Sequence, residues 1–177
     1  MYSRFLFQII IIGLMVCFQV AFIAELPLGL ANINLVLVVL VVLLILGKES
    51  TVWAWAIALG AVEDIYSFYP FGKHLIGMIA ALLVARVLLH RFFTNRSLYA
   101  FIALGTVAVV CFFVFGYGWV AGIYFLAGKQ FAAWRLLGER LIGGVLANAL
   151  LMVVAFYILN YLSLNFKPVF LQPKQQL

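Results

Sequence analysis

Two adjacent acidic residues, Glu63 and Asp64, are the part of this sequence with the clearest chemical potential. The chain has only five carboxylate side chains among its 177 residues, and two of them are neighbours. Paired carboxylates can share the work of general acid and general base. On a helix, however, neighbouring residues point about 100° apart, and no serine–lysine, zinc-protease or nucleotide-loop motif accompanies this pair. We therefore predict no catalytic residue and expect a protein that is not an enzyme.

Small residues beside the pair suggest a structural or partner-binding role instead. Gly60 lies one helical turn before Asp64, and small residues at this spacing let a second helix approach closely. A carboxylate at such a contact can cap the N-terminus of a neighbouring helix or pair with a basic side chain. Two roles for Asp64 follow: it stabilises a helix contact within one subunit, or it binds a partner protein. The candidate residues for these roles are Gly60, Glu63, Asp64, Gly72 and Arg86.

The composition places these residues in a membrane protein. Hydrophobic residues make up 68% of the chain and charged residues 9%, against about 25% charged in a typical soluble protein. Since a helix needs roughly 20 apolar residues to cross a bilayer, long stretches without charge predict membrane spans. Four such stretches are residues 5–24, 26–47, 97–128 and 141–166.

We predict an all-α protein with one membrane domain over residues 1–166 and a cytoplasmic tail at 167–177. Lys129 would cost about 2.5–3.5 kcal/mol at the bilayer centre, and glycines interrupt the pattern from Gly116. Residues 117–138 are therefore expected to be re-entrant or interfacial. The six predicted transmembrane helices cover residues 5–24, 33–47, 51–68, 74–91, 97–116 and 141–162. Asn148, alone in the last span, is expected to form a hydrogen bond between helices.

The distribution of basic residues predicts the orientation. With six spans, seven of the eleven Lys and Arg residues fall on the side of both termini, which is therefore cytoplasmic. A seven-span arrangement, in which residues 118–134 cross the membrane, also puts seven basic residues inside, so the count predicts a cytoplasmic N-terminus but does not choose between six and seven spans. The six-span arrangement puts Glu63 and Asp64 at the extracytoplasmic surface and Arg86 and His90 at the cytoplasmic one, as a basic anchor. Scattered basic residues do not indicate nucleic-acid binding, and the sparse Cys and His residues predict no metal or other cofactor.

A short pattern resembles the MreD family of bacterial rod shape-determining membrane proteins. Its elements are Gly60-x-x-x-Asp64, then Gly72, then a span that ends in arginine. Asn34 opens the second span like the Pro-Asn entry of that family, although Ile33 stands where the family has proline.

The resemblance covers roughly residues 10–161 and includes the loop at 93–98. It implies a fold similar to the substrate-binding subunits of energy-coupling factor transporters, and a junction of the third and fourth spans shaped by Gly60, Asp64 and Gly72. It also implies a non-enzymatic scaffold of the cell-elongation machinery in the bacterial plasma (inner) membrane, supporting peptidoglycan synthesis. The implied partners are an MreC-like membrane protein, the RodA and penicillin-binding-protein synthase pair, and the actin-like MreB system.

The alternative function is a transporter subunit that binds a small, vitamin-like molecule. The small residues Gly13, Cys17 and Ala21 follow one another at four-residue spacing and would form its docking face for the energising subunit. Against this alternative, the predicted extracytoplasmic loops are short and offer few polar side chains to a ligand.

Overall fold

The computed structural model describes residues 2–23, 32–67, 69–92, 98–128 and 134–165. These residues form an all-α fold in which a short π-helical segment continues the first helix. The six α-helices are α1 (Tyr2–Phe18), α2 (Leu35–Ile45), α3 (Glu49–Tyr66), α4 (Lys73–Arg91), α5 (Leu98–Leu126) and α6 (Trp134–Asn165), and the π-helical segment is η1 (Gln19–Ile23).

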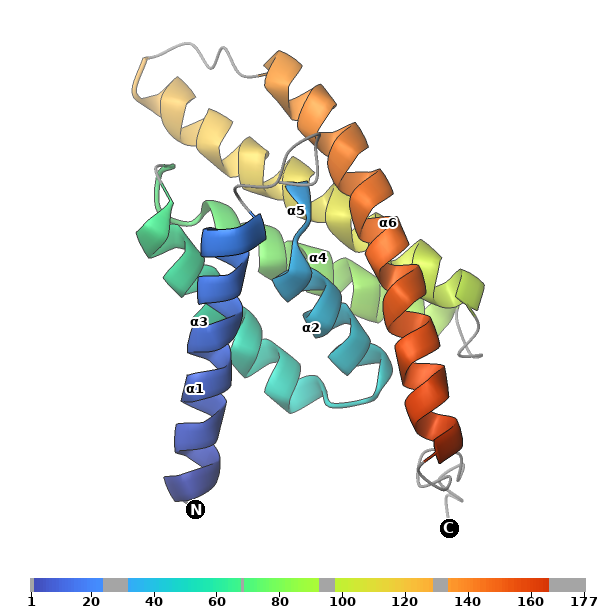
Figure 1. The fold of residues 1–177 in the computed structure, drawn as a ribbon. Coiled ribbons are helices and arrows are strands. Elements are labelled where there is room, and N and C mark those ends of the chain that lie inside the picture. The colour runs from blue at the N-terminus through green and yellow to red at the C-terminus, as the bar shows by residue number, and fades with distance from the viewer. Residues whose placement is uncertain (1, 24–31, 68, 93–97, 129–133, 166–177) are drawn as a thin grey trace.

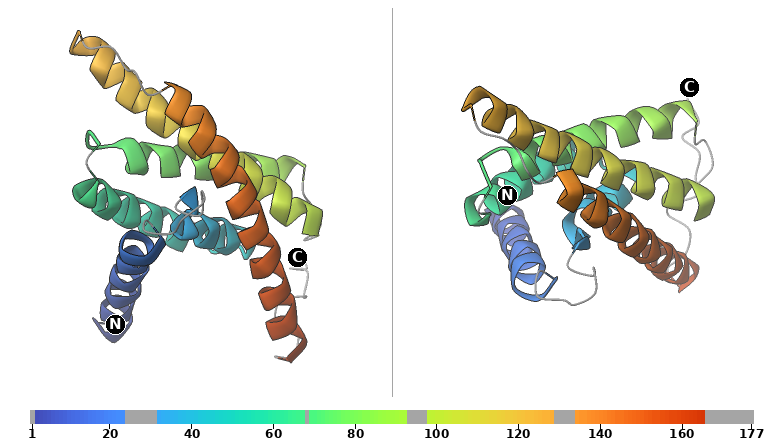
Figure 2. Two further views of the ribbon diagram at one scale, coloured as in Figure 1. Left: turned by 45° about the horizontal axis from the view of Figure 1, so that its top comes forward. Right: turned by 90° about the horizontal axis from the view of Figure 1, so that it is seen from above.

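The short helix α2 lies at the centre of the fold. Helices α1 and α6 flank it and diverge toward the end of the molecule where α1 begins and α6 ends (Figure 1). Successive helices run in opposite directions, and α3 and α4 lie side by side (Figure 2). A helix that is apolar on all sides belongs in an interior, and α2 meets this description, with seven buried residues: Val36, Leu37, Val38, Leu40, Val41, Leu44 and Ile45.

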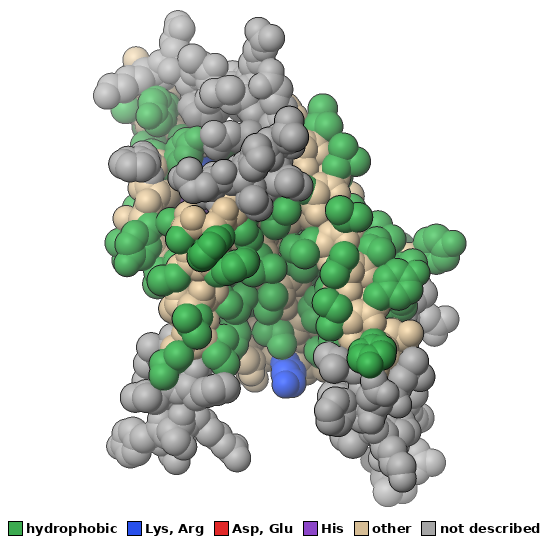
Figure 3. All heavy atoms as spheres, in the orientation of Figure 1, with side chains coloured by type: hydrophobic (Ala, Val, Ile, Leu, Met, Phe, Trp, Pro, Cys, Tyr) green, Lys and Arg blue, Asp and Glu red, His purple; other side chains and the backbone are tan. Residues whose placement is uncertain are grey.

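Three helices are long and apolar enough to cross a membrane. They are α4, α5 and the part of α6 from Leu141 to Tyr161, and they indicate a multi-pass membrane protein. One face of the molecule is covered mainly by hydrophobic side chains (Figure 3), as contact with lipid requires. Helix α2 is much shorter, about 16 Å at 1.5 Å per residue, and its eleven residues cover only part of the span predicted at 33–47.

The expected interruption at Gly116 is wrong. Helix α5 continues without a break to Leu126, and α6 already begins at Trp134. Most of the segment 117–138 therefore belongs to two long helices, while Lys129 lies outside the described residues. A Cβ atom on Gly116 would come within 2.9 Å of the backbone oxygen of Lys73. This glycine thus allows close packing of α5 on α4 and does not mark a turn.

We predict that Gly116→Ala lowers the free energy of unfolding by about 1–3 kcal/mol, because the added methyl group overpacks the contact with the backbone of α4. The matched control is Gly118→Ala, on the same helix, where a Cβ atom would meet nothing within 4 Å. Alanine there should be neutral or gain up to about 1 kcal/mol from helix propensity. Thermal unfolding in detergent measures both variants, and equal stabilities would refute the assigned role of Gly116.

Candidate functional site

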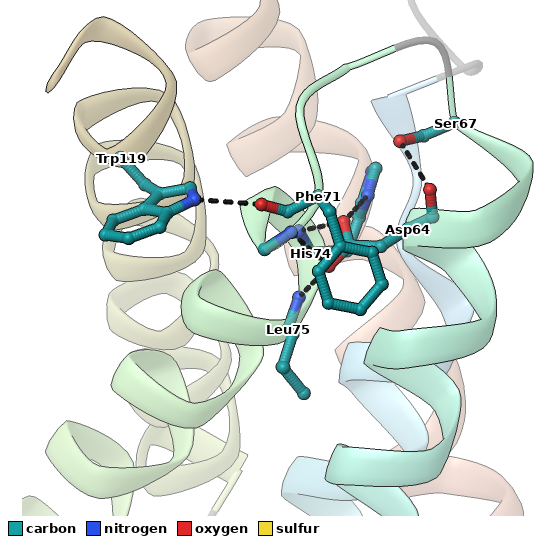
Figure 4. Close-up of polar contacts among 7 residues, drawn as sticks. Asp64, Ser67, Phe71, His74, Leu75 and Trp119 are labelled. Atoms are coloured by element: carbon teal, nitrogen blue, oxygen red, sulfur yellow. Dashed lines mark hydrogen bonds and ion pairs between the residues drawn. The ribbon is translucent and has the colours of Figure 1, made fainter. Parts of the chain in front are cut away.

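The carboxylate of Asp64, in the last turn of α3, binds the first turn of α4. The backbone N–H of Gly72 donates to Oδ2 at 2.9 Å, that of His74 to Oδ1 at 2.8 Å, and that of Leu75 to Oδ2 at 3.2 Å (Figure 4). The first N–H groups of any helix lack partners within that helix, and Gly72, the residue before α4, has no side chain to cap them. Asp64 therefore caps α4 from the neighbouring helix.

His74 completes the set of donors around Asp64. Its Nδ1 lies 2.9 Å from Oδ1 of Asp64, and it donates a hydrogen bond to this oxygen when the ring carries its proton on Nδ1. The side chain of Asp64 has no exposed surface, whereas that of His74 is 17% exposed. A buried carboxylate is costly unless hydrogen bonds satisfy it, and here four contacts within the chain do so.

Two glycines make this approach of α3 and α4 possible. A Cβ atom on Gly60 would lie 2.8 Å from the Cα atom of Leu75, so the helices touch backbone to backbone there. Gly72 has a φ of +103°, which L-residues with a side chain rarely adopt. A Cβ atom on Gly72 would also lie 2.6 Å from Nε1 of Trp119. That indole N–H donates to the backbone oxygen of Phe71 at 3.0 Å (Figure 4) and ties the junction to α5.

The structure thus brings three of the five candidate residues, Gly60, Asp64 and Gly72, to one junction. Backbone N–H groups of the Gly72–Leu75 segment occupy both carboxylate oxygens of Asp64, and the residue is only 4% exposed. Of the two roles considered for Asp64, this geometry favours stabilisation of a helix contact within the subunit over direct contact with a partner.

Arg86 lies at the opposite end of α4, away from this junction. Its Nη2 is 2.8 Å from Oε2 of Glu49 in the first turn of α3, and Nε2 of His90 is 2.9 Å from Oε1 of the same carboxylate. The hydrogen bond with His90 is the main cause that lowers the pKa of Glu49, and the positive charge of Arg86 adds to it. The basic pair expected to act as a surface anchor therefore also ties α4 to α3, a contact that sequence analysis missed.

Glu63 lines a cavity of about 200 Å³, whose lining also includes Ser67, Lys73 and His74 from the junction of α3 and α4. It is 6% exposed, and its Oε1 accepts no hydrogen bond from the part of the chain that the structure describes. The polar side chains around this cavity come from four separate segments, and they include Gln19, Asn32, Asn34, Glu63, Lys73 and His74.

The polar entry to α2 forms another part of the cavity lining. Gln19 Nε2 donates to the backbone oxygen of Ile33 at 2.7 Å, and the N–H of Leu35 donates to Gln19 Oε1 at 2.9 Å. The N–H of Asn34 donates to Oδ1 of Asn148 at 2.9 Å. This bond joins α2 to α6 and confirms the hydrogen bond predicted for Asn148.

None of the described His, Cys, Asp and Glu residues form a group of three or more that could hold a metal ion. Comparison of the chain with protein-family models, with curated proteins and with solved structures found no significant match. The interpretation of the site therefore rests on its own geometry.

We predict that Asp64→Ala lowers the free energy of unfolding by at least about 3 kcal/mol, because three backbone N–H groups lose a charged acceptor in a buried place. Asp64→Asn, which keeps one oxygen, should lose less. The control is Glu63→Gln at the adjacent position, because the Oε1 atom of Glu63 accepts no hydrogen bond from described groups. Thermal unfolding in detergent that gives Asp64→Ala and Glu63→Gln the same stability would contradict the capping role.

Proposed function

We propose that this chain is a non-enzymatic membrane scaffold of the MreD type, which supports peptidoglycan synthesis in bacterial cell elongation by assembling partner proteins. One observation carries the proposal: Gly60, Asp64 and Gly72, the residues of the resemblance, form a single buried junction. Gly60 allows the close approach of α3 and α4, Asp64 caps α4, and Gly72 adopts the left-handed backbone conformation at the turn.

The role of Asp64 supports a structural function of this residue over a catalytic one. Both oxygens of Asp64 accept backbone hydrogen bonds from α4, so this carboxylate stabilises the fold. Catalysis by a carboxylate requires an oxygen that reaches a substrate proton. The junction gives the protein a rigid pair of helices, which is what a scaffold needs in order to present a fixed surface.

The proposed topology has six spans, with the N- and C-termini in the cytoplasm and residues 167–177 as a cytoplasmic tail. The start of α1 and the end of α6 lie at the same end of the molecule (Figure 1). Glu49 and its partners Arg86 and His90 join the start of α3 to the end of α4. The excess of basic residues on the side of both termini supports this side as the cytoplasmic one.

The proposed mode of assembly is docking of helices within the bilayer. Gly13, Cys17 and Ala21 are all exposed on α1 and η1, and small residues at this spacing accept a neighbouring helix. A Cβ atom on Gly13 would meet nothing within 4 Å, so this surface serves no internal packing at that point. The proposed occupant is the transmembrane helix of an MreC-like protein. The RodA and penicillin-binding-protein pair and the MreB system would join the same assembly.

We predict that Gly13→Leu reduces recovery of the MreC-like partner at least about tenfold, as expected when a bulky side chain enters a close helix contact. The thermal unfolding of the isolated protein should stay unchanged, because the added side chain meets open space at its base. The control is Gly118→Leu on α5, whose Cβ position is also open. Native mass spectrometry after purification in mild detergent measures the recovery of the partner.

Equal recovery with both variants would contradict docking at α1. A stoichiometric small molecule without any protein partner would contradict the scaffold and favour the transporter subunit.

A further inference from the structure

The cavity beside Glu63 has features of a ligand site. It lies between the polar entry to α2 and the junction of α3 and α4, and its volume is about 200 Å³. Pockets for drug-sized ligands usually measure about 300–1,000 Å³, so this cavity suits a smaller molecule. Polar side chains and the aromatic rings of Phe112, Phe113 and Tyr117 line it together.

Glu63 is the lining side chain with unmet hydrogen-bonding capacity. Gln19, Asn34, Ser67 and His74 all have hydrogen bonds to described groups. Glu63, in contrast, is buried, with only 6% of its surface exposed, and its Oε1 accepts no hydrogen bond from described groups. Buried polar atoms are nearly always paired, and an unpaired one calls for a specific reason. Rotation about the broad terminal torsion of glutamate can present either oxygen to the cavity.

The ammonium group of Lys73, which also lines the cavity, restricts the class of ligand that fits. The Nζ of Lys73 lies 3.5 Å from the ring centroid of Tyr69 and 4.6 Å from that of Tyr117. A simple cation near Glu63 would be repelled by this ammonium group, and a simple anion held by Lys73 would bring no donor for the unpaired Oε1 of Glu63. A molecule that carries both charges complements both side chains.

We propose that the cavity binds a small zwitterion of the amino-acid type. Its ammonium group donates to the carboxylate of Glu63, its carboxylate faces Lys73, and its side chain packs on Phe112, Phe113 and Tyr117. Ammonium groups are also attracted to aromatic faces, which these rings supply. The inference depends only on the cavity and holds whether or not the protein acts as a scaffold.

The test is a thermal-shift screen of the full-length protein in detergent with each of the standard L-amino acids, because a ligand of the folded state raises the unfolding temperature with concentration. The best amino acid is then compared with its amine lacking the carboxylate and its acid lacking the amine. We expect at least one amino acid to bind and both truncated compounds to bind at least about tenfold more weakly, as for the loss of one charged hydrogen bond.

Variants test the assigned contacts. Glu63→Gln should weaken binding of the same amino acid at least about tenfold, while Glu49→Gln, at the far end of α3, should leave it unchanged. No shift with any amino acid at millimolar concentration would overturn the proposal, as would equal binding of the amine alone or unchanged binding in Glu63→Gln. If Glu63→Gln does not fold, the comparison of truncated compounds on the natural protein decides the question.

Discussion

The cap that Asp64 places on α4 is the interaction on which the rest of the structure depends. A helix that begins inside a membrane protein cannot leave its first N–H groups to water, and Gly72 offers no side chain to receive them. The carboxylate from α3 solves this problem and thereby fixes where α4 begins. Helix α4 in turn supports α5, which packs on it through Gly116 and through Trp119 at the junction.

The entry to α2 obeys the same constraint with neutral groups. Gln19 and Asn148 bind the backbone that leads into this buried helix, because unpaired amides in an apolar interior are costly. The entry to α2 and the junction of α3 and α4 both contribute residues to the lining of one cavity, and Glu63 lines it as well, with an oxygen that the described residues leave unpaired. The hydrogen bonds of Gln19, Asn34 and Asp64 to the backbone mark these residues as structural, whereas the unpaired Oε1 of Glu63 is the basis for assigning this residue to a ligand.

Sequence reasoning reached the features that are local or compositional. Long uncharged stretches predict the all-α, membrane-type fold, and the spacing of Gly60 and Asp64 predicts a close helix contact beside a carboxylate. Features that join distant segments were not predictable: nothing in the sequence links Glu49 to Arg86, or Gln19 to the cavity beside Glu63. Gly116 was misread because a glycine that breaks a helix and one that admits a neighbouring backbone look identical in sequence; only the position of Lys73 distinguishes them.

Hydrogen exchange measured by mass spectrometry on the peptide that contains Gly72, His74 and Leu75 tests the central claim most directly. Amides held by a buried carboxylate open only with the surrounding structure. The account predicts slow exchange of these amides in the natural protein and exchange at least about tenfold faster in Asp64→Asn, while peptides from the middle of α5 keep their protection. Exchange at this peptide that is the same in both proteins would contradict the cap as the interaction that fixes α4.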